Sequence, residues 1–157
     1  MSVRVEVVDG ALTRELRRAV LRPDRAPGAT LPGDELTDAV HVAALDSGGR
    51  VLGTCYVFPD ACPWRPDRAP AWHLRQMATD PDHRGAGIGR AVLTGALRHA
   101  TEAGGVLMWC NARETARVFY AGAGFRPYGS GYLDGPYRLP HIRMWMDLEP
   151  DSPATAS

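Results

Sequence analysis

The sequence has no excess charge of either sign and no long apolar run. Its 18 Lys and Arg residues balance 18 Asp and Glu residues, which gives a net charge of +0 at pH 7 and a pI ≈ 7.0. We therefore expect no nucleic-acid partner, because such a partner requires a basic surface. No apolar run approaches the roughly 20 residues of a membrane-spanning helix, so we expect no membrane partner either.

Cysteine is too scarce and too scattered for a disulfide framework or a metal site. Cys55, Cys62 and Cys110 are odd in number and lack the spacing of metal ligands. The N-terminus carries no secretory hydrophobic region. The prediction is a set of free thiols in a reducing cytoplasm, with no bound metal.

The chain is long enough for one domain with a sizeable core. It has 157 residues, of which 45% are hydrophobic and 23% are charged. We expect a single domain over residues 1–149 and a frayed polar tail over residues 150–157. The apolar periodicities predict the order β-α-β-β-β-α-β-α-β-β. The predicted fold class is α/β (α+β mixed): a central mixed, largely antiparallel sheet of about 7 strands with helices on both faces.

Three further segments bear on function. Leu12, Leu16 and Val20 predict a short helix whose arginines lie on its outer face. Residues 23–37 are rich in proline, glycine and aspartate, and a loop of this length is either functional or disordered. Residues 142–148 alternate between apolar and polar, so the last strand is expected to be half exposed. If it is an uncapped edge, it could pair with a second copy in a homodimer.

The most informative stretch runs from residue 71 to residue 105 and predicts a strand, a glycine-rich turn and a helix. The helix face is marked by apolar residues that recur every four positions from Ile88 onward. The N–H groups at the start of that helix lack intrahelical partners, and the helix dipole is positive there. Arg84 and Arg90 flank the turn, so a phosphate could bind. A tight turn that needs glycine for geometry alone remains the alternative.

Two familiar glycine motifs do not fit this turn. A P-loop requires Lys-Ser or Lys-Thr after its last glycine, and Arg90-Ala91 follows here. A dinucleotide fingerprint requires Gly-x-Gly-x-x-Gly and an acidic residue about 20 positions further on. The corresponding residues in this chain are Cys110 and Asn111. Both interpretations are therefore rejected.

The turn does contain Arg-x-x-Gly-x-Gly, at Arg84, Gly87 and Gly89. With residues 77–89 the chain resembles the acetyl-CoA signature of the GNAT superfamily of acetyl-CoA-dependent N-acetyltransferases. A second block, Trp109-Cys110-Asn111 followed by residues 119–125, resembles the next segment of that family. The resemblance covers residues 3–148, although the first third matches only in general shape.

The resemblance implies that acetyl-CoA is the co-substrate and that the loop at residues 23–37 sets acceptor specificity. Met77 and Thr79 would bind the pantetheine arm through their backbone N–H and C=O groups, as an added strand does. Asn111, which we expect at the end of its strand, is either a ligand of that arm or a simple turn residue. The predicted cofactor-binding residues are Met77, Ala78, Thr79, Arg84, Gly85, Ala86, Gly87, Ile88, Gly89, Arg90, Asn111 and Tyr120.

Attack of an amine on a thioester requires two proton transfers. The amine, with an unperturbed pKa near 10.4, must lose a proton, and the leaving thiolate gains from a donor. The resemblance assigns Tyr120 as the donor; packing on the sheet is the alternative. His73 occupies the place of a catalytic glutamate found in several family members and is the candidate base. His141 and a water chain are competing candidates, whereas His83 is expected to be exposed on the loop.

These observations predict an N-acetyltransferase that acts on a primary amine of a small molecule or on an exposed protein amine. The alternative from another class is a non-catalytic acyl-CoA-binding sensor with the same fold. A nucleotide-binding module is disfavoured, because the lysine and the acidic residue of the two rejected motifs are missing.

Overall fold

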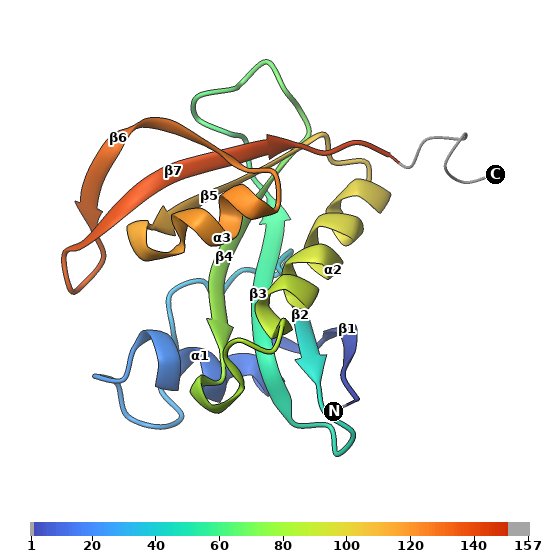
Figure 1. The fold of residues 1–157 in the computed structure, drawn as a ribbon, viewed down its shortest axis with the longest axis vertical. Coiled ribbons are helices and arrows are strands. Elements are labelled where there is room, and N and C mark those ends of the chain that lie inside the picture. Colours follow the sequence, from blue (N-terminus) through green and yellow to red (C-terminus); the bar gives the residue numbers. More distant parts are fainter. Residues whose placement is uncertain (1, 151–157) are drawn as a thin grey trace. The chain divides into compact units, whose positions relative to one another are not determined.

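The computed structural model describes residues 2–150, and its elements follow the predicted order (Figure 1). The helices and strands are β1 (Arg4–Val8), the 3-10 turn η1 (Gly10–Thr13), α1 (Arg14–Leu21), β2 (Val40–Leu45), β3 (Val51–Pro59), β4 (Ala71–Thr79), the 3-10 turn η2 (Pro81–His83), α2 (Ile88–Glu102), β5 (Leu107–Arg113), the 3-10 turn η3 (Glu114–Ala116), α3 (Arg117–Gly122), β6 (Arg126–Asp134) and β7 (Leu139–Asp147).

The seven strands are hydrogen-bonded in the order β1-β2-β3-β4-β5-β7-β6. Strands β4 and β5 are parallel, whereas the β1–β2, β2–β3, β5–β7 and β6–β7 pairs are antiparallel. This confirms the predicted mixed, largely antiparallel sheet.

Internal contacts divide the chain into two units. The first unit comprises residues 2–58 and 74–99, and the second comprises residues 59–73 and 100–150. The single domain over residues 1–149 stays a prediction. The predicted tail, apart from Pro150, lies outside the described residues.

In the first unit, α2 lies directly on one face of the strands, and glycines mark the closest contacts. A Cβ atom at Gly53 of β3 would be 2.6 Å from Cγ2 of Ile88, and one at Gly95 of α2 would be 2.8 Å from Cγ1 of Val5. On the other face, a Cβ at Gly10 would be 2.6 Å from Nε2 of His41, so η1 packs there. Because a strand's side chains alternate between faces, this unit has helical structure on both faces, as predicted.

The orientation of α1 differs from the prediction. The Arg17 side chain is only 1% exposed, whereas Leu12, just before the helix, is 64% exposed. The prediction that the arginines face outward is therefore wrong for Arg17. The physical reason is that Arg17 has enough hydrogen-bond acceptors around it to offset its desolvation.

The second unit is built on the antiparallel β5–β7 ladder and the long β6–β7 hairpin (Figure 1). Its buried cluster contains Cys62, Ala71, Leu107, Trp109 and Trp145. The prediction that the last strand could be an open edge is wrong, because β7 lies between β5 and β6. The edge strand is β6, which is exposed over most of its length. A homodimer stays a prediction, but pairing through β7 is blocked by its two neighbours.

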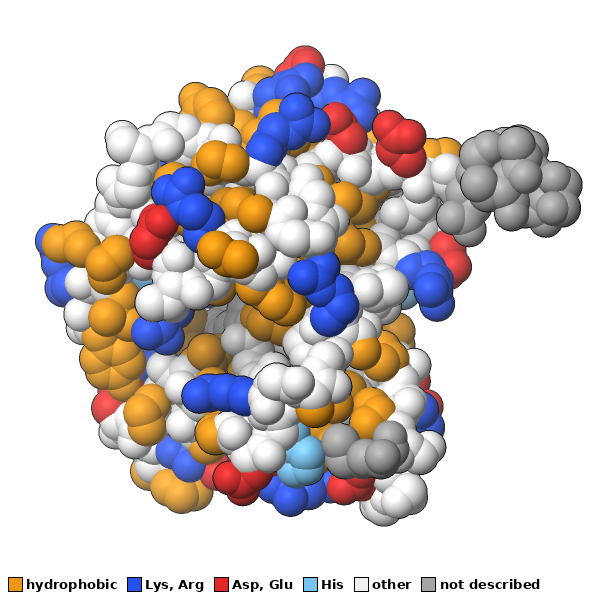
Figure 2. Space-filling view, viewed as in Figure 1, with side chains coloured by type: hydrophobic (Ala, Val, Ile, Leu, Met, Phe, Trp, Pro, Cys, Tyr) orange, Lys and Arg blue, Asp and Glu red, His pale blue; other side chains and the backbone are white. Residues whose placement is uncertain are grey.

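Charges of both signs are interspersed with apolar side chains on the face shown in Figure 2. Among residues 2–150, no helix is both long and apolar enough to span a membrane. The same residues contain no group of three or more His, Cys, Asp or Glu side chains placed to hold a metal ion.

Candidate active site

Residues 80–87, here called the glycine loop, connect β4 to α2 in the first unit. Asp80 fixes the start of the loop: its N–H donates to the carbonyl of Leu52 (2.8 Å), and its carboxylate accepts the N–H of Asp82 (2.9 Å). The same carboxylate pairs with Arg50. The Asp82 N–H, which outweighs the opposing effect of burial, and the charge of Arg50 hold the pKa of Asp80 below its usual range. The loop therefore leaves β4 from a fixed point.

The glycines of this loop are required by backbone conformation. Gly85 and Gly87 have φ angles of +82° and +80°, a region that L side chains rarely adopt. Apart from each glycine and its two chain neighbours, no described heavy atom lies within 4 Å of the point where a Cβ would stand. Both glycines are exposed. The turn is thus not closed by packing, and a ligand has room to reach its backbone.

Backbone donors gather at the start of α2. The Ala91 N–H donates to the carbonyl of Gly87 (3.0 Å), and the N–H groups of Ile88 and Gly89 precede it, at positions where a helix provides no acceptor one turn earlier. The first turn of α2, all of it described, has no acidic residue. Arg84 and Arg90 are exposed beside it. With the helix dipole, these features favour a negatively charged ligand at this position.

The end of β4 precedes this loop and contains an unusual residue. Gln76 has a φ of 55°, although it is not glycine and lies inside a strand. Its neighbour Met77 is half-buried, as is Thr79, and Ala78 is buried. A left-handed residue interrupts the regular alternation of a strand. Sequence reasoning missed Gln76, because a glutamine in a strand gives no signal of such a conformation.

His73, the candidate base, lies in the second unit and is part of a compact cluster. Its Nδ1 is 3.1 Å from Oδ2 of Asp60, and its ring stacks on Trp109 with a centroid distance of 3.6 Å and an interplanar angle of 13°. The Trp109 Nε1–H donates to the carbonyl of Asp60 (2.9 Å), which ties Asp60 to the same cluster. Only 7% of His73 is exposed. Asp60 was also missed, because an aspartate in a proline-rich connection has no distinguishing pattern.

Tyr120, the candidate donor, is buried in α3 of the second unit. Its ring makes edge contacts with Phe119 (5.1 Å) and Phe125 (5.3 Å) between centroids. Its carbonyl accepts the N–H groups of Ala123 and Phe125, which closes the helix. The ring is thus held in place by packing on two sides. Its role as a proton donor stays a prediction.

Asn111 does not end its strand, which corrects the prediction. Strand β5 continues to Arg113, and Asn111 is exposed opposite Arg143 of β7. The strand continues past this polar residue because β7 supplies a backbone partner throughout. The parallel β4–β5 pairing, by contrast, ends at His73 and Trp109. Beyond that pair, β5 runs on to Arg113 along β7.

His141 and His83 each lie beside a nearby polar group of their own unit. The Nδ1–H of His141 donates to the carbonyl of Leu139 (2.7 Å), and its ring lies near Tyr132. His83 is half-buried rather than exposed, since its Nδ1 is within 3.8 Å of the Asp80 carboxylate. The structure therefore brings together the glycine loop and the end of β4 in one unit, and His73 with Asp60 in the other.

Comparison with known proteins decides the family. The model of the acetyltransferase (GNAT) domain matches residues 37–127. The chain belongs to the GNAT acetyltransferase family. As a GNAT protein it is an acyltransferase, and the predicted family and enzyme class are confirmed. The matched region includes the glycine loop, His73 and Tyr120.

Relatives of this GNAT protein extend over nearly the whole chain. YitI, an uncharacterized N-acetyltransferase of Bacillus subtilis (strain 168), is 26% identical over 93% of this chain and 97% of its own. Among solved structures, the IAA acetyltransferase of Bacillus cereus ATCC 14579 has a TM-score of 0.71 at 21% identity, covering 94% of this chain and 100% of that one. An aminoglycoside 6'-N-acetyltransferase complexed with coenzyme A has a TM-score of 0.73 at 14% identity, covering 95% and 99%. The structural matches show a shared fold.

Proposed function

We propose that this GNAT protein transfers an acetyl group from acetyl-CoA to a primary amine, by direct attack of the amine on the thioester. The amine belongs to a small molecule or is exposed on a protein. The observation that carries this proposal is the glycine loop, with its two left-handed glycines open to solvent at the start of α2. The coenzyme A bound to the aminoglycoside acetyltransferase of the same fold supports the choice of an acyl-CoA.

The residues of the loop fit the anionic pyrophosphate of acetyl-CoA. The backbone N–H groups at the start of a helix, here those of Ile88 and Gly89, can donate to an incoming anion. Arg84 and Arg90 add positive charge. One guanidinium group can donate two parallel hydrogen bonds to two oxygens of a phosphate. Gly85 has no side chain and that of Ala86 is a single methyl group, so neither obstructs the approach of the ligand. We assign these residues, together with Gly87, to the phosphate site.

The strand before the loop would hold the pantetheine arm. Backbone N–H and C=O groups of Met77 and Thr79 can pair with the two amides of that arm as a neighbouring strand would. Ala78, between them, is buried and leaves the main chain of the strand fixed. In the second unit we assign Asn111, which is exposed, as a side-chain partner of the same arm. The bound thioester supplies an acyl group that is already activated for attack.

Two side chains of the second unit handle the protons in this proposal. Tyr120 donates the proton of its Oη to the leaving thiolate. His73 takes the proton from the amine at Nε2. The Asp60 carboxylate, 3.1 Å from Nδ1, supports this role, because a carboxylate that accepts the Nδ1–H leaves the lone pair on Nε2. Asp60 thereby orients the base.

The test is an amine panel assayed for release of free thiol from acetyl-CoA. The wild type should release CoA with at least one amine, and Tyr120→Phe should lower kcat by about 100-fold, the usual loss for a general acid. Tyr128→Phe, which removes a hydroxyl from an exposed residue of β6, is the matched control and should keep its activity. Acetyl-CoA that binds without any transfer would contradict the proposal, as would full activity of Tyr120→Phe.

The role of His73 as the base is tested by substituting His73 itself and its partner Asp60. Asp60→Asn should lower kcat/KM and move the acidic limb of its pH profile, because it changes the proton affinity of the imidazole. His73→Gln should lower kcat/KM and remove that limb, because it removes the imidazole itself. If His141→Gln produces these effects and His73→Gln does not, the base is misassigned.

A further inference from the structure

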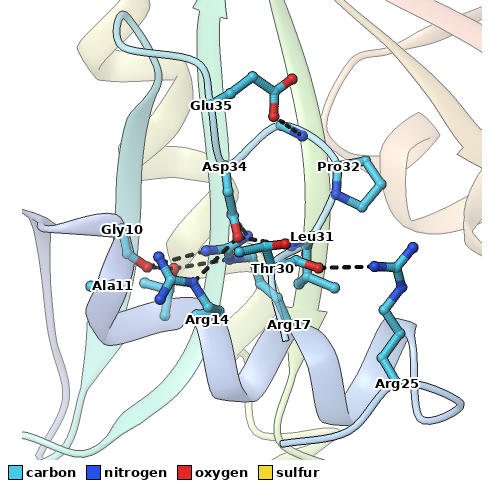
Figure 3. Close-up of polar contacts among 12 residues, drawn as sticks. Gly10, Ala11, Arg14, Arg17, Arg25, Thr30, Leu31, Pro32, Asp34 and Glu35 are labelled. Atoms are coloured by element: carbon cyan, nitrogen blue, oxygen red, sulfur yellow. Dashed lines mark hydrogen bonds and ion pairs between the residues drawn. The ribbon is translucent and has the colours of Figure 1, made fainter. Parts of the chain in front are cut away.

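A buried arginine joins three segments of the first unit. The Nε–H of Arg17 donates to Oγ1 of Thr13 (3.0 Å), and Nη2 donates to the carbonyl of Gly10 (3.1 Å). Nη1 donates both to Oδ1 of Asp34 (2.9 Å) and to Oε1 of Gln76 (2.9 Å). Helix α1, the loop that carries Asp34 and strand β4 therefore meet at one guanidinium, which is part of the network drawn in Figure 3.

The loop is tied to this network through residues 31–34. The Asp34 carboxylate accepts the N–H of Leu31 (2.8 Å) and also lies 3.3 Å from Nε of Arg14 (Figure 3). The carbonyl of Pro32 accepts the Nε2–H of Gln76 (2.6 Å). Gln76 is thus held at both ends of its amide, by Arg17 and by the loop.

The residue held in this way has a strained backbone. Gln76 has a φ of 55°, and a non-glycine residue keeps a left-handed conformation only where its surroundings impose it. The peptide unit that follows Gln76 contains the N–H of Met77. Since φ and ψ of a residue set the direction of the next peptide, the tether on the Gln76 side chain acts on the direction of that N–H.

We propose that Arg17 is a positioning residue for acyl transfer: through the Gln76 amide it holds the Gln76–Met77 peptide in the direction that the thioester requires. The inference rests on the proposed function, because it assumes that β4 binds acetyl-CoA. It also links the loop at residues 31–34 to the cofactor strand, since Asp34 and Pro32 bind the same two side chains. An acceptor that moves this loop therefore changes the strand that holds the thioester.

A buried ion pair that serves stability alone is the competing explanation. It would account for the Arg17–Asp34 contact, but not for the two bonds that Gln76 makes or for its backbone conformation. The two explanations differ in what Gln76→Met does. That variant leaves Arg17 and Asp34 paired, keeps the side-chain length and removes both amide bonds.

The experiment compares Gln76→Met, Arg17→Met and the double variant with Arg14→Met as the matched control. Arg14 also contacts Asp34 from α1, but its side chain is 38% exposed and its Nε lies 3.3 Å from Oδ2 of Asp34. Each protein is assayed for folding by circular dichroism, for CoA affinity by calorimetry and for kcat at saturating acetyl-CoA. Gln76→Met should lower kcat by about 10-fold, because small misplacements of a reacting group are costly. CoA affinity should stay within about 3-fold, since the glycine loop is untouched and at most one backbone bond to the pantetheine arm is weakened. Arg14→Met should keep kcat within about 2-fold.

The double variant shows whether Arg17 acts on kcat through Gln76 or whether the two substitutions act independently. If Arg17 acts through Gln76, the double variant should lose about 10-fold in kcat, whereas independent effects would multiply to about 100-fold. Unchanged kcat in folded Gln76→Met overturns the inference, as does an equal loss in Arg14→Met. If Arg17→Met fails to fold, Gln76→Met decides alone. A wild type that neither binds CoA nor releases thiol would refute the proposed function itself. An active wild type whose Gln76 and Arg17 variants are equally active would refute only the inference about Arg17.

Discussion

The two longer helices of the first unit begin in opposite ways. Before α1, Asp9 caps the 3-10 turn by accepting the N–H of Ala11 (2.9 Å), and the first turn of α1 contains Glu15. Helix α2 follows two left-handed glycines and has no acidic residue in its first turn, all of which is described. The positive end of α1 is thus neutralised by the protein itself, whereas that of α2 is left for an incoming anion.

The arginines of the two helices repeat this contrast. Arg17 of α1 is buried and bound to Asp34, while Arg84 and Arg90 beside α2 are exposed. A buried cation whose donors are used fixes structure, whereas an exposed cation at the start of a helix can also contact a ligand. The comparison contrasts a charge that stabilises this unit with charges that we propose to bind a ligand.

The largest expected effect comes from closing the open start of α2. Gly87→Glu places a carboxylate where the phosphate should bind and should weaken CoA binding by about 100-fold or more, as measured by calorimetry. Gly49→Glu is the matched control, because Gly49 has a similar φ of +85°, is equally open and lies in the β2–β3 turn. It should cost comparable stability and leave CoA affinity unchanged. Equal weakening in both variants would mean that strain, not charge, is responsible.

The next effect tests the internal pairing of α1. Burial alone would raise the pKa of Asp34, but the Leu31 N–H and the charges of Arg17 and Arg14 hold it below its usual range. A carboxyl whose pKa is lower in the folded state than in the unfolded state stabilises the fold at a pH above its unfolded-state pKa. That stabilisation is lost as the pH falls through the folded-state pKa. Asp34→Asn should therefore cost about 3 kcal/mol of unfolding free energy at pH 7. The difference from the wild type should shrink below about pH 4 in urea titrations. A difference that is independent of pH would contradict this pairing.

A smaller effect should follow from giving α2 the acid that α1 has. Arg90→Glu places a carboxylate in the first turn, which should stabilise the ligand-free helix by about 0.3–1 kcal/mol through the dipole. The same change should weaken CoA binding by about 10-fold, because it reverses the charge beside the phosphate site. Arg90→Gln separates loss of the positive charge from gain of the negative one. Thermal melts should show a higher melting temperature and calorimetry a weaker CoA affinity. Stability and affinity must change in opposite directions, so a variant in which both rise or both fall would contradict the prediction.

The smallest effect concerns the acid of α1. Arg18 hydrogen-bonds Glu15 and thereby lowers its pKa, so this contribution to stability exists at neutral pH and is lost on acidification. Glu15→Gln should lower the melting temperature at pH 7 by about 2 °C or less, since the pair is exposed to solvent. The shift should vanish near pH 3. CoA affinity should not change, because α1 has no open anion site.

The sequence was sufficient for the order of elements and for the glycine loop, because both have local signals. Residues 88–100 carry a helical apolar period, and Gly85, Gly87 and Gly89 lie immediately before and at the start of that helix. The hairpin turn after β2 and the strands around it were equally local. Such patterns indicate where each helix and strand lies along the chain. The predicted order of elements is confirmed by the observed helices and strands.

The buried polar groups could not be predicted, because their partners are distant in sequence. Arg17 was expected outside, since nothing within α1 indicates that Asp34 and Gln76 would accept its N–H groups. Asn111 was expected at a strand end, because the pairing with β7 that carries β5 onward comes from the other end of the chain. Tyr120 and His73 were nominated by resemblance to a family, and their roles remain proposals.

The close contact between Gly53 and Ile88 has a further consequence. Ile88 is the first residue of α2, and a methyl group at position 53 would collide with its side chain at 2.6 Å and lie 3.6 Å from the carbonyl of Ala78. The absence of one methyl group in the middle of β3 therefore sets the spacing between the mouth of the helix and the end of the strand that precedes the loop. A substitution at position 53 would make no ligand contact of its own, but it would change the distance between the start of α2 and the end of β4. In the proposed function this distance sets the length of ligand that both can bind, so binding of the nucleotide part of acetyl-CoA can be adjusted from within the core.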